Sequence, residues 1–415
     1  MTRQLGRGAG LRAVLRGPLR RHWLLLVYVG SVVLVTFQFG GRGIANNIKI
    51  FRWSFFHLLH AQDLYQAYPH LYYDVFKYSP SWALLFGPFA LPPTAVGFFL
   101  WDLCAALLFY VALTRLLPGP RARLALGIAF FEFLAAMQHA SSTNAVVTAL
   151  IILAFVTLEE NRQSLAALAI ALGALMKLYP LAALAFAVFH PRKTRFGLLV
   201  ATAIAALVAL PLVVTSPGAL GAQWRSWGRV LAVDSTFTGF AVMHFLRVWF
   251  NVAWPNWAVQ LAGTLVLVLP LAVRRDRWAE PHFRRLWLCS VLLYCLIFNH
   301  QSERPSFVVG FTGIAIWYAI SRPTDLRNLL MLIAFIGVPL LHSDVVPWGF
   351  RRNVLLPHAV IAMPCMLLWF VMQVELLRGS RGDERRPTDP WLPGFPWTGD
   401  SAVPERDPPG LTEST

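Results

Sequence analysis

The chain has 415 residues, of which 57% are hydrophobic and 13% are charged. An ordinary soluble domain carries about twice that charged share, so the composition excludes a soluble globular protein and predicts an integral membrane protein. The formal net charge of +16 does not indicate nucleic-acid binding, because the sequence has no soluble domain that would gather basic residues on one face.

Apolar segments recur along the chain at lengths that suit a bilayer core of ~30 Å. The first, residues 23–39, follows a basic terminus at 1–22. We interpret it as a membrane anchor, because no small-residue cleavage site of a signal peptide follows Phe39. The others are residues 81–117, 124–137, 144–158, 164–176, 178–189, 196–214, 257–273, 286–298, 307–320, 328–341 and 354–374. This pattern predicts an all-α polytopic bundle of about 10–13 transmembrane helices.

Two segments depart from a simple span. Residues 81–117 contain Pro88, Pro92 and Pro93, so we predict a kinked span or a partial hairpin that opens a groove between helices. Residues 240–251 are predicted to form either a further short span or a helix in the membrane interface.

The distribution of Lys and Arg orients the chain. An inside amino terminus places most of these residues in inner loops, as the positive-inside tendency requires. The basic inner segments are residues 3–21, 115–123, 192–195, 274–285 and the carboxyl-terminal tail. We therefore expect both termini in the cytoplasm, a membrane domain at 23–374 and a disordered, proline-rich tail at 375–415.

With this orientation, the loops richest in mixed polar chemistry all lie on the outer face. They are residues 60–80, 138–144, 177–180, 217–238, 299–306 and 342–353. Convergent polar loops on one face predict an active site or a pore mouth. The first outer loop, residues 40–80, is predicted to carry the chemistry and to include short interfacial helices.

That loop holds two acids, Asp63 and Asp74, among tyrosines and a lone Lys77. An acid in an aromatic, partly desolvated loop can take a proton from a hydroxyl, which is the task of a general base. The alternative for Asp63 is to cap a short helix over 64–68, and Asp74 is either a second acid or a cap before 75–78. From the residue type alone, capping is the commoner role, so both interpretations stay open.

Lys177 stands between two apolar runs in the sequence GALMKLYPL, shortly before Pro180. A cation at such a place can pair with a phosphate. A lysine that snorkels from a helix end explains the position equally well.

The sequence IFNHQSERPSF places His300, Glu303 and Arg304 directly after an apolar segment. The histidine can donate to phosphate or shuttle a proton, and Arg304 can bind phosphate through two parallel hydrogen bonds. The alternative is a local ion pair between Glu303 and Arg304, but the density of functional groups favours a site. Weaker candidates of the same kind are Gln138, His139, Asn144, His342, Asp344, Arg351 and Arg352.

Neither the cysteines nor the acids indicate a metal site. Cys104, Cys289, Cys295 and Cys365 fall inside apolar segments without paired metal-ligand spacing, and we interpret them as small buried side chains. The first outer loop has no Asp-X-Asp pair for a divalent metal.

Several of these motifs together resemble glycosyltransferase family 87, of the GT-C class of membrane enzymes. The resemblance rests on DLYQAYP followed by FKYSPSWALLFGPFALPP, then QHASSTNAVVTALIILAF, MKLYP and NHQSERPSF. These motifs occur in the expected order over residues 46–306. The absence of a glycine-rich phosphate loop agrees with an enzyme that binds no nucleotide.

The resemblance implies transfer of a sugar, mannose or a similar hexose or pentose, from a polyprenyl-phosphate donor to a lipid or glycan acceptor. It places this reaction on the outer face of a bacterial inner membrane and makes Asp63 the base of an inverting displacement. Lys177, His300 and Arg304 would neutralise the departing phosphate. The tyrosines would stack on sugar faces or shape the donor groove, and no cofactor or metal is expected. The expected substrate contacts are Tyr65, Tyr68, Lys77, Tyr78, Gln138, Asn144, Lys177, Tyr179, His300, Glu303 and Arg304.

The main alternative is a transporter or flippase of a lipid-linked saccharide. Asp102 and Glu132, which lie inside apolar segments, support it if they face a pathway, but burial against a neighbouring helix with a hydrogen-bond partner explains them too. The absence of an internal repeat tells against a transporter. A polysaccharide polymerase or ligase shares the substrate class but uses a large outer loop that this chain lacks.

Overall fold

The computed structural model describes residues 7–42, 46–138 and 142–378. The secondary structure within these ranges is entirely helical, which confirms the predicted all-α fold. The helices of the first half are α1 (Arg7–Arg42), α2 (Asn46–Leu59), α3 (Pro80–Leu85), α4 (Gly87–Ala90), α5 (Thr94–Leu116), α6 (Gly119–Gln138), α7 (Thr143–Glu159), α8 (Gln163–Met176) and the 3-10 helix η1 (Tyr179–Phe189).

The second half continues the same pattern. Its α-helices are α9 (Lys193–Ala209), α10 (Pro217–Asp234), α11 (Val242–Phe250), α12 (Asn256–Val273), α13 (Pro281–Ile297), α14 (Phe307–Ile320), α15 (Asp325–Phe335), α16 (Trp348–Phe350) and α17 (Ala362–Arg378). Shorter 3-10 and π-helical turns are η2 (Leu210–Val213), η3 (Arg275–Arg277), η4 (Arg304–Ser306), η5 (Ile336–Leu340) and η6 (Arg351–Leu355).

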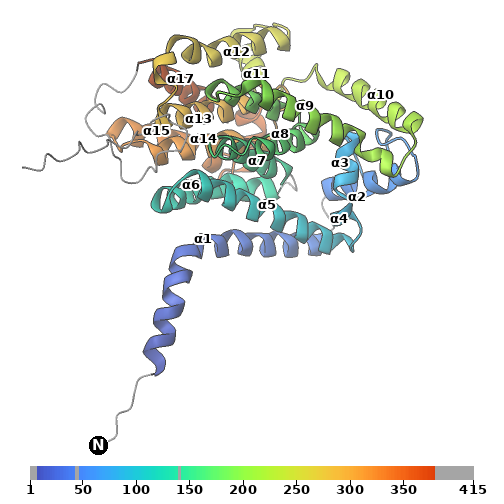
Figure 1. Cartoon of the computed structure of the whole chain (residues 1–415), viewed down its shortest axis with the longest axis horizontal. Helices are drawn as coiled ribbons and strands as arrows, with labels where there is room; N and C mark the ends of the chain where they lie inside the picture. The colour runs from blue at the N-terminus through green and yellow to red at the C-terminus, as the bar shows by residue number, and fades with distance from the viewer. Residues whose placement is uncertain (1–6, 43–45, 139–141, 379–415) are drawn as a thin grey trace, which may run out of the picture.

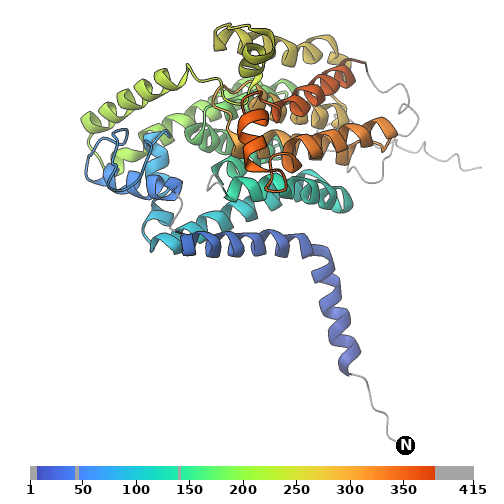
Figure 2. The same ribbon diagram turned by 180° about the vertical axis from the view of Figure 1, so that it is seen from behind.

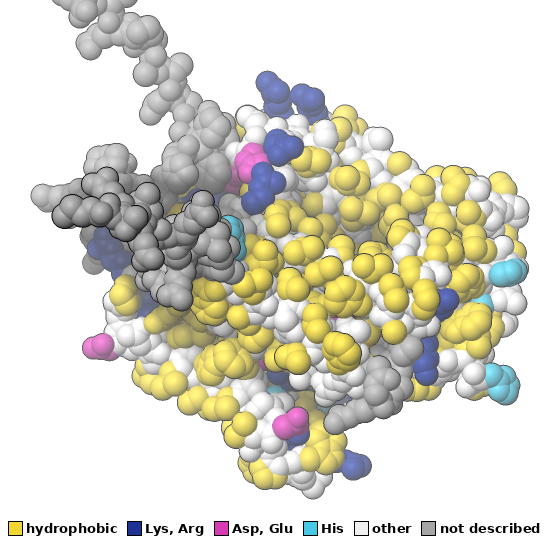
Figure 3. Space-filling model, turned by 90° about the horizontal axis from the view of Figure 1, so that it is seen from below, with side chains coloured by type: hydrophobic (Ala, Val, Ile, Leu, Met, Phe, Trp, Pro, Cys, Tyr) yellow, Lys and Arg dark blue, Asp and Glu magenta, His cyan; other side chains and the backbone are white. Residues whose placement is uncertain are grey.

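Five helices are long and apolar enough to cross a membrane. They cover His22–Phe39, Thr94–Leu116, Lys193–Val213, Asn256–Val273 and Val360–Arg378. Only 17% of the Lys193–Val213 window is buried inside the protein, so its apolar side chains face outward, as lipid contact requires. Figure 3 shows one face covered largely by hydrophobic side chains, with few charges near its centre. The protein is therefore membrane-integral; the number of crossings beyond these five stays a prediction.

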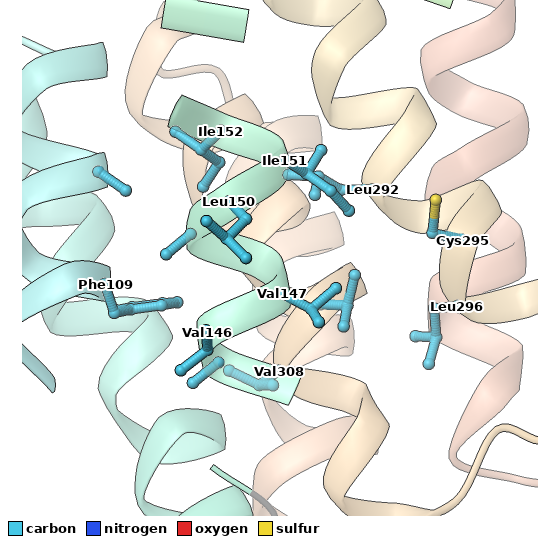
Figure 4. Close-up of a cluster of buried hydrophobic side chains, with 14 of the residues drawn as sticks. Phe109, Val146, Val147, Leu150, Ile151, Ile152, Leu292, Cys295, Leu296 and Val308 are labelled. Carbon is cyan, nitrogen blue, oxygen red and sulfur yellow. The ribbon is translucent and has the colours of Figure 1, made fainter. Parts of the chain in front are cut away.

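The core of the bundle is built around α7. Every residue of α7 except Leu153 is buried. Between lipid-facing helices, close packing rather than exclusion of water supplies much of the stability. Figure 4 shows this contact: side chains of α7 lie among those of α5, α13 and α14, with the labelled residues Val146, Val147, Leu150, Ile151, Ile152, Phe109, Leu292, Cys295, Leu296 and Val308.

The predicted break in residues 81–117 is confirmed. This segment forms α3 and α4, which end before Pro92 and Pro93, and then the longer α5. Gly97 permits α4 to fold closely onto α5, because a Cβ at Gly97 would lie 2.0 Å from the carbonyl oxygen of Phe89. The prolines interrupt the backbone hydrogen bonds at the point where the chain reverses.

The bundle has two distinct polar ends. At one end, Arg115 pairs with Glu160 at 2.7 Å and Arg284 pairs with Glu159 at 2.9 Å, which brings basic segments of the sequence together. The other end carries α2, α3, α4 and α10, grouped at the right in Figure 1 and at the left in the reverse view of Figure 2. The long middle helices connect these two ends.

Three sequence predictions need adjustment. Cys104 is exposed on α5, whereas the other three cysteines are buried as predicted. Helix α17 continues to Arg378, beyond the predicted start of the tail at 375. His139 and the tail from 379 onward lie outside the described residues.

Candidate active site

The first outer loop is held in place by α10, a helix that the sequence analysis treated as a loop. The amide nitrogen of Leu64 donates to Oε1 of Gln223 at 3.0 Å, and the Gln223 amide donates to the carbonyl of Gln62 at 2.8 Å. Nε1 of Trp227 donates to the carbonyl of Lys77 at 3.0 Å. One face of α10 therefore holds this loop at two places, around residues 62–64 and at Lys77.

Asp63 lies half-buried in this clamped loop. Its Oδ1 accepts a hydrogen bond from the Tyr65 amide at 3.0 Å, and its Oδ2 accepts from the Ser226 hydroxyl at 3.2 Å. Arg229 in turn donates to the Ser226 hydroxyl at 3.0 Å. The predicted helix over 64–68 does not form, so the Asp63 carboxylate closes a turn instead of capping a helix.

The tyrosines of the loop divide into structural and accessible groups. Tyr65 is 9% exposed, and its hydroxyl donates to the carbonyl of Tyr78 at 2.7 Å. The ring of Tyr65 is therefore largely enclosed by the loop, and its contact with substrate stays a prediction. Tyr68 is half-buried, stacks on His57 at 3.9 Å between ring centroids, and donates to the carbonyl of Asp63 at 2.7 Å.

The second acid of the loop, Asp74, is exposed and does little to hold the surrounding residues in place. Asp74 has a φ of 73° and accepts a hydrogen bond from the Val75 amide at 2.8 Å. The predicted helix at 75–78 does not form, so the capping interpretation is wrong. Its carboxylate lies 3.8 Å from the ammonium of Lys77, a solvent-exposed pair of small energetic value.

Lys177 is the centre of a more enclosed cluster. Its ammonium donates to Oδ1 of the buried Asn144 at 2.8 Å. Burial lowers the pKa of Lys177, and the charge of the nearby Glu303 partly offsets that effect. The side chain thus points into the protein, which decides against a snorkelling lysine. A partly desolvated ammonium is well suited to receive an anion.

Tyr78 joins this cluster from the first outer loop. Its hydroxyl lies 3.3 Å from the hydroxyl of Thr143, next to Asn144. Burial raises the pKa of Tyr78 to about 12, an effect that the Thr143 hydrogen bond opposes and the Glu303 charge reinforces. Tyr65 connects the two groups, because its amide binds Asp63 and its hydroxyl binds the Tyr78 carbonyl.

The turn after α13 is fixed from two sides. His300 lies 3.2 Å from the Gln260 amide, and burial lowers its pKa. Arg304 forms two hydrogen bonds with Glu132 of α6, one of them at 2.8 Å. The partner of Arg304 is thus Glu132 rather than its neighbour Glu303. Glu303 is exposed, and its charge raises the pKa of Lys177.

The two acids that a transporter interpretation would use both bind neighbouring side chains, although Oδ2 of Asp102 is buried without a hydrogen-bond partner among the described residues. Glu132 carries the Arg304 ion pair, and Asp102 accepts a hydrogen bond from the Ser142 hydroxyl. Each is buried between helices. The ion pair with Arg304 therefore gives Glu132 a structural explanation.

The remaining predicted residues are spread more widely. Tyr179 has a buried hydroxyl without a hydrogen-bond partner among the described residues and lies close to Tyr78. Gln138 is exposed at the end of α6. Arg351 pairs with Asp344 at 2.8 Å in a separate outer segment. Within the described ranges, no three His, Cys, Asp or Glu side chains gather as a metal site; metal independence stays a prediction.

The comparison with protein families agrees with this geometry. The model of glycosyltransferase family 87 matches residues 76–298, which is more than half of the chain. The chain belongs to glycosyltransferase family 87. It is therefore a membrane glycosyltransferase. No curated protein matches the chain.

The matched part of this family 87 glycosyltransferase covers most of the enclosed cluster. It includes Tyr78, Asn144 and Lys177, whereas Asp63 and Glu303 lie outside it. The sequence analysis missed the contributions of α10 and of Thr143. One signal was present for α10: a serine followed by proline at 216–217, where the Ser216 hydroxyl accepts from the Ala219 amide at 3.3 Å and caps the helix.

Proposed function

We propose that this glycosyltransferase is of the GT-C class. It moves a sugar, mannose or a similar hexose or pentose, from a polyprenyl-phosphate donor to a lipid or glycan acceptor on the non-cytoplasmic face of a bacterial inner membrane. The observation that carries the proposal is that one site holds an oriented carboxylate, Asp63, and an enclosed ammonium, Lys177, in segments connected through Tyr65 and Tyr78. A nucleophile-activating acid and a phosphate-binding cation are the two groups that such a transfer needs.

Asp63 is assigned the role of general base. Hydrogen bonds from the Tyr65 amide and the Ser226 hydroxyl hold its two oxygens in place, while the carboxylate remains half-exposed and able to meet a substrate. The acceptor hydroxyl gives its proton to Asp63 as its oxygen bonds to the anomeric carbon. The bond from that carbon to the phosphate oxygen breaks at the same time, so the anomeric configuration inverts.

Lys177 is assigned to the leaving group. The polyprenyl phosphate departs with the electron pair of the broken bond, and an ammonium within hydrogen-bond reach stabilises the charge that develops on its oxygen. Asn144 holds Lys177 in position, and the charge of Glu303 partly offsets the lowering of the Lys177 pKa by burial. Tyr78 borders this region through the contact of its hydroxyl with Thr143, next to Asn144.

Arg304 receives a different role from the one expected. Its guanidinium is committed to Glu132 through two hydrogen bonds, so it positions the turn that carries Glu303. Lys177 is then the main side chain that binds the phosphate of the donor. This assignment needs no metal ion and no nucleotide.

The test is sugar transfer by purified full-length protein. The assay supplies radiolabelled polyprenyl phosphate mannose and a panel of membrane glycolipid acceptors to wild type, Asp63→Asn and Asp74→Asn. Loss of a general base slows transfer by about 10²–10⁴-fold, so we expect that loss for Asp63→Asn. Asp74→Asn is the matched control, since it removes an exposed acid from the same loop.

Each outcome decides a separate part of the proposal. Transfer by Asp63→Asn at the wild-type rate contradicts the base assignment but keeps the activity. Retention of anomeric configuration in the product contradicts the single displacement. No transfer by folded wild type to any acceptor contradicts the donor assignment.

A further inference from the structure

A polar cavity lies at the opposite end of α8 from Lys177. It has a volume of about 340 Å³ and is formed by the connections before α8 and before α9. Helix α8 has 14 residues, so it rises about 20 Å between the cavity and the Lys177 cluster. The cavity is therefore separate from the candidate active site. It shares its end of the bundle with the ion pair of Arg115 and Glu160.

The walls of this cavity are strongly basic. Three guanidinium groups line it, those of Arg162, Arg192 and Arg195, and no acidic side chain does. The nearest acid, Glu160, already binds Arg115 at 2.7 Å and lies 3.8 Å from Arg162. Across the described residues, Arg192 and Arg195 form no ion pair. Such a cavity favours an anion with several oxygen acceptors.

The floor of the cavity is a hydrogen-bonded framework. The buried ring of His190 lies 2.9 Å from the Gln163 amide and 2.9 Å from Oδ1 of Asn161. The Arg192 amide also donates to Nδ1 of His190 at 3.1 Å. Burial and the Arg192 charge both lower the pKa of His190, and its hydrogen bonds link the two connections. These hydrogen bonds thus fix the two connections that carry the arginines.

The surroundings of the cavity indicate a lipid rather than a soluble anion. Leu165 lines the cavity itself and is 40% exposed, and Leu168 follows one turn later on the same helix face. On α9, Leu198 is 66% exposed one turn beyond Arg195. An apolar surface therefore runs from the basic cavity along both helices. A phosphate in the cavity would leave attached acyl chains on this surface.

We propose that this cavity binds the phosphate headgroup of an anionic membrane phospholipid, whose acyl chains lie along α8 and α9. Basic pockets between membrane helices on the cytoplasmic side commonly hold such headgroups. The proposal does not depend on the sugar donor or on the role of Asp63. Bound lipid would then stabilise the end of α8 that lies opposite the Lys177 cluster.

The test measures lipid binding to the purified full-length protein by native mass spectrometry. Phosphatidylglycerol and phosphatidylcholine are titrated separately, and a third titration adds inorganic phosphate as competitor. The test variant is the double substitution Arg192→Gln with Arg195→Gln. The control removes two exposed arginines from the same end but outside the cavity, Arg123→Gln with Arg275→Gln. Equal thermal transitions without lipid verify that both variants fold.

We expect wild type and the control to bind phosphatidylglycerol more tightly than phosphatidylcholine. The Arg192 and Arg195 variant should bind it roughly thirtyfold more weakly, since each arginine contributes about 1 kcal/mol to attraction of anionic lipid. Equal weakening in the control overturns the proposal, because binding would then be diffuse. Equal affinity for both lipids, or displacement of lipid by inorganic phosphate at comparable concentration, also overturns it.

Discussion

The ion pair between Glu132 and Arg304 offers a sharp test of how the site is assembled. The Glu132 side chain is fully buried, the Arg304 side chain is 14% exposed, and two hydrogen bonds join them. Glu132→Gln removes the counter-charge and leaves a guanidinium in a mostly desolvated place. Breaking a buried pair from one side costs about 3–5 kcal/mol. We therefore expect a loss of this size in the free energy of unfolding.

The assay is equilibrium unfolding in mixed micelles with an increasing fraction of denaturing detergent. Asp344→Asn is the control, because it removes an ion pair with Arg351 in which the Asp344 side chain is fully exposed, and it should leave stability unchanged. The double variant Glu132→Gln with Arg304→Gln should recover most of the loss, since no unpaired charge remains. A loss below about 1 kcal/mol for Glu132→Gln, or a double variant no better than the single, refutes the reasoning.

Three further predictions concern Lys177 and Gly239. Lys177→Met should slow transfer by about 10²-fold through loss of the leaving-group cation, whereas Lys177→Arg should keep more of the rate. Because burial lowers the pKa of Lys177, wild-type kcat should fall on the alkaline side as the ammonium loses its proton. That alkaline fall should disappear in Lys177→Arg, and its persistence would assign the titration to another group. Gly239→Ala should destabilise by about 1–3 kcal/mol, because Gly239 has a φ of 47° and a Cβ would lie 2.5 Å from the Ser302 carbonyl oxygen. Gly228→Ala on α10, where a Cβ meets nothing within 4 Å, should be neutral or stabilising in the same unfolding measurement.

Much of the fold could be predicted because hydropathy is a local property. Apolar segments such as 144–158 and 257–273 correspond closely to α7 and α12. The break at Pro92 and Pro93 was also predictable, since proline acts on its own backbone. Helix α10 was missed because its polar residues resemble a loop, although Trp227 and Gln223 hold the first outer loop in place.

The candidate site was only partly predictable, for a physical reason. Residue types identified Asp63, Lys177 and Glu303 as chemically capable, since carboxylates and ammonium groups carry that information by themselves. Whether each is available depends on partners distant in the chain. Arg304 has an acid beside it in sequence, yet binds Glu132 on another helix.

The sequence by itself therefore determined the membrane class, the helical segments and the set of candidate groups, because these follow from composition and local pattern. Only the tertiary structure decided that Tyr65 is buried, that Ser226 orients Asp63, and that Asn144 holds Lys177. Such contacts join residues many positions apart, and their formation depends on how the helices pack rather than on any one segment.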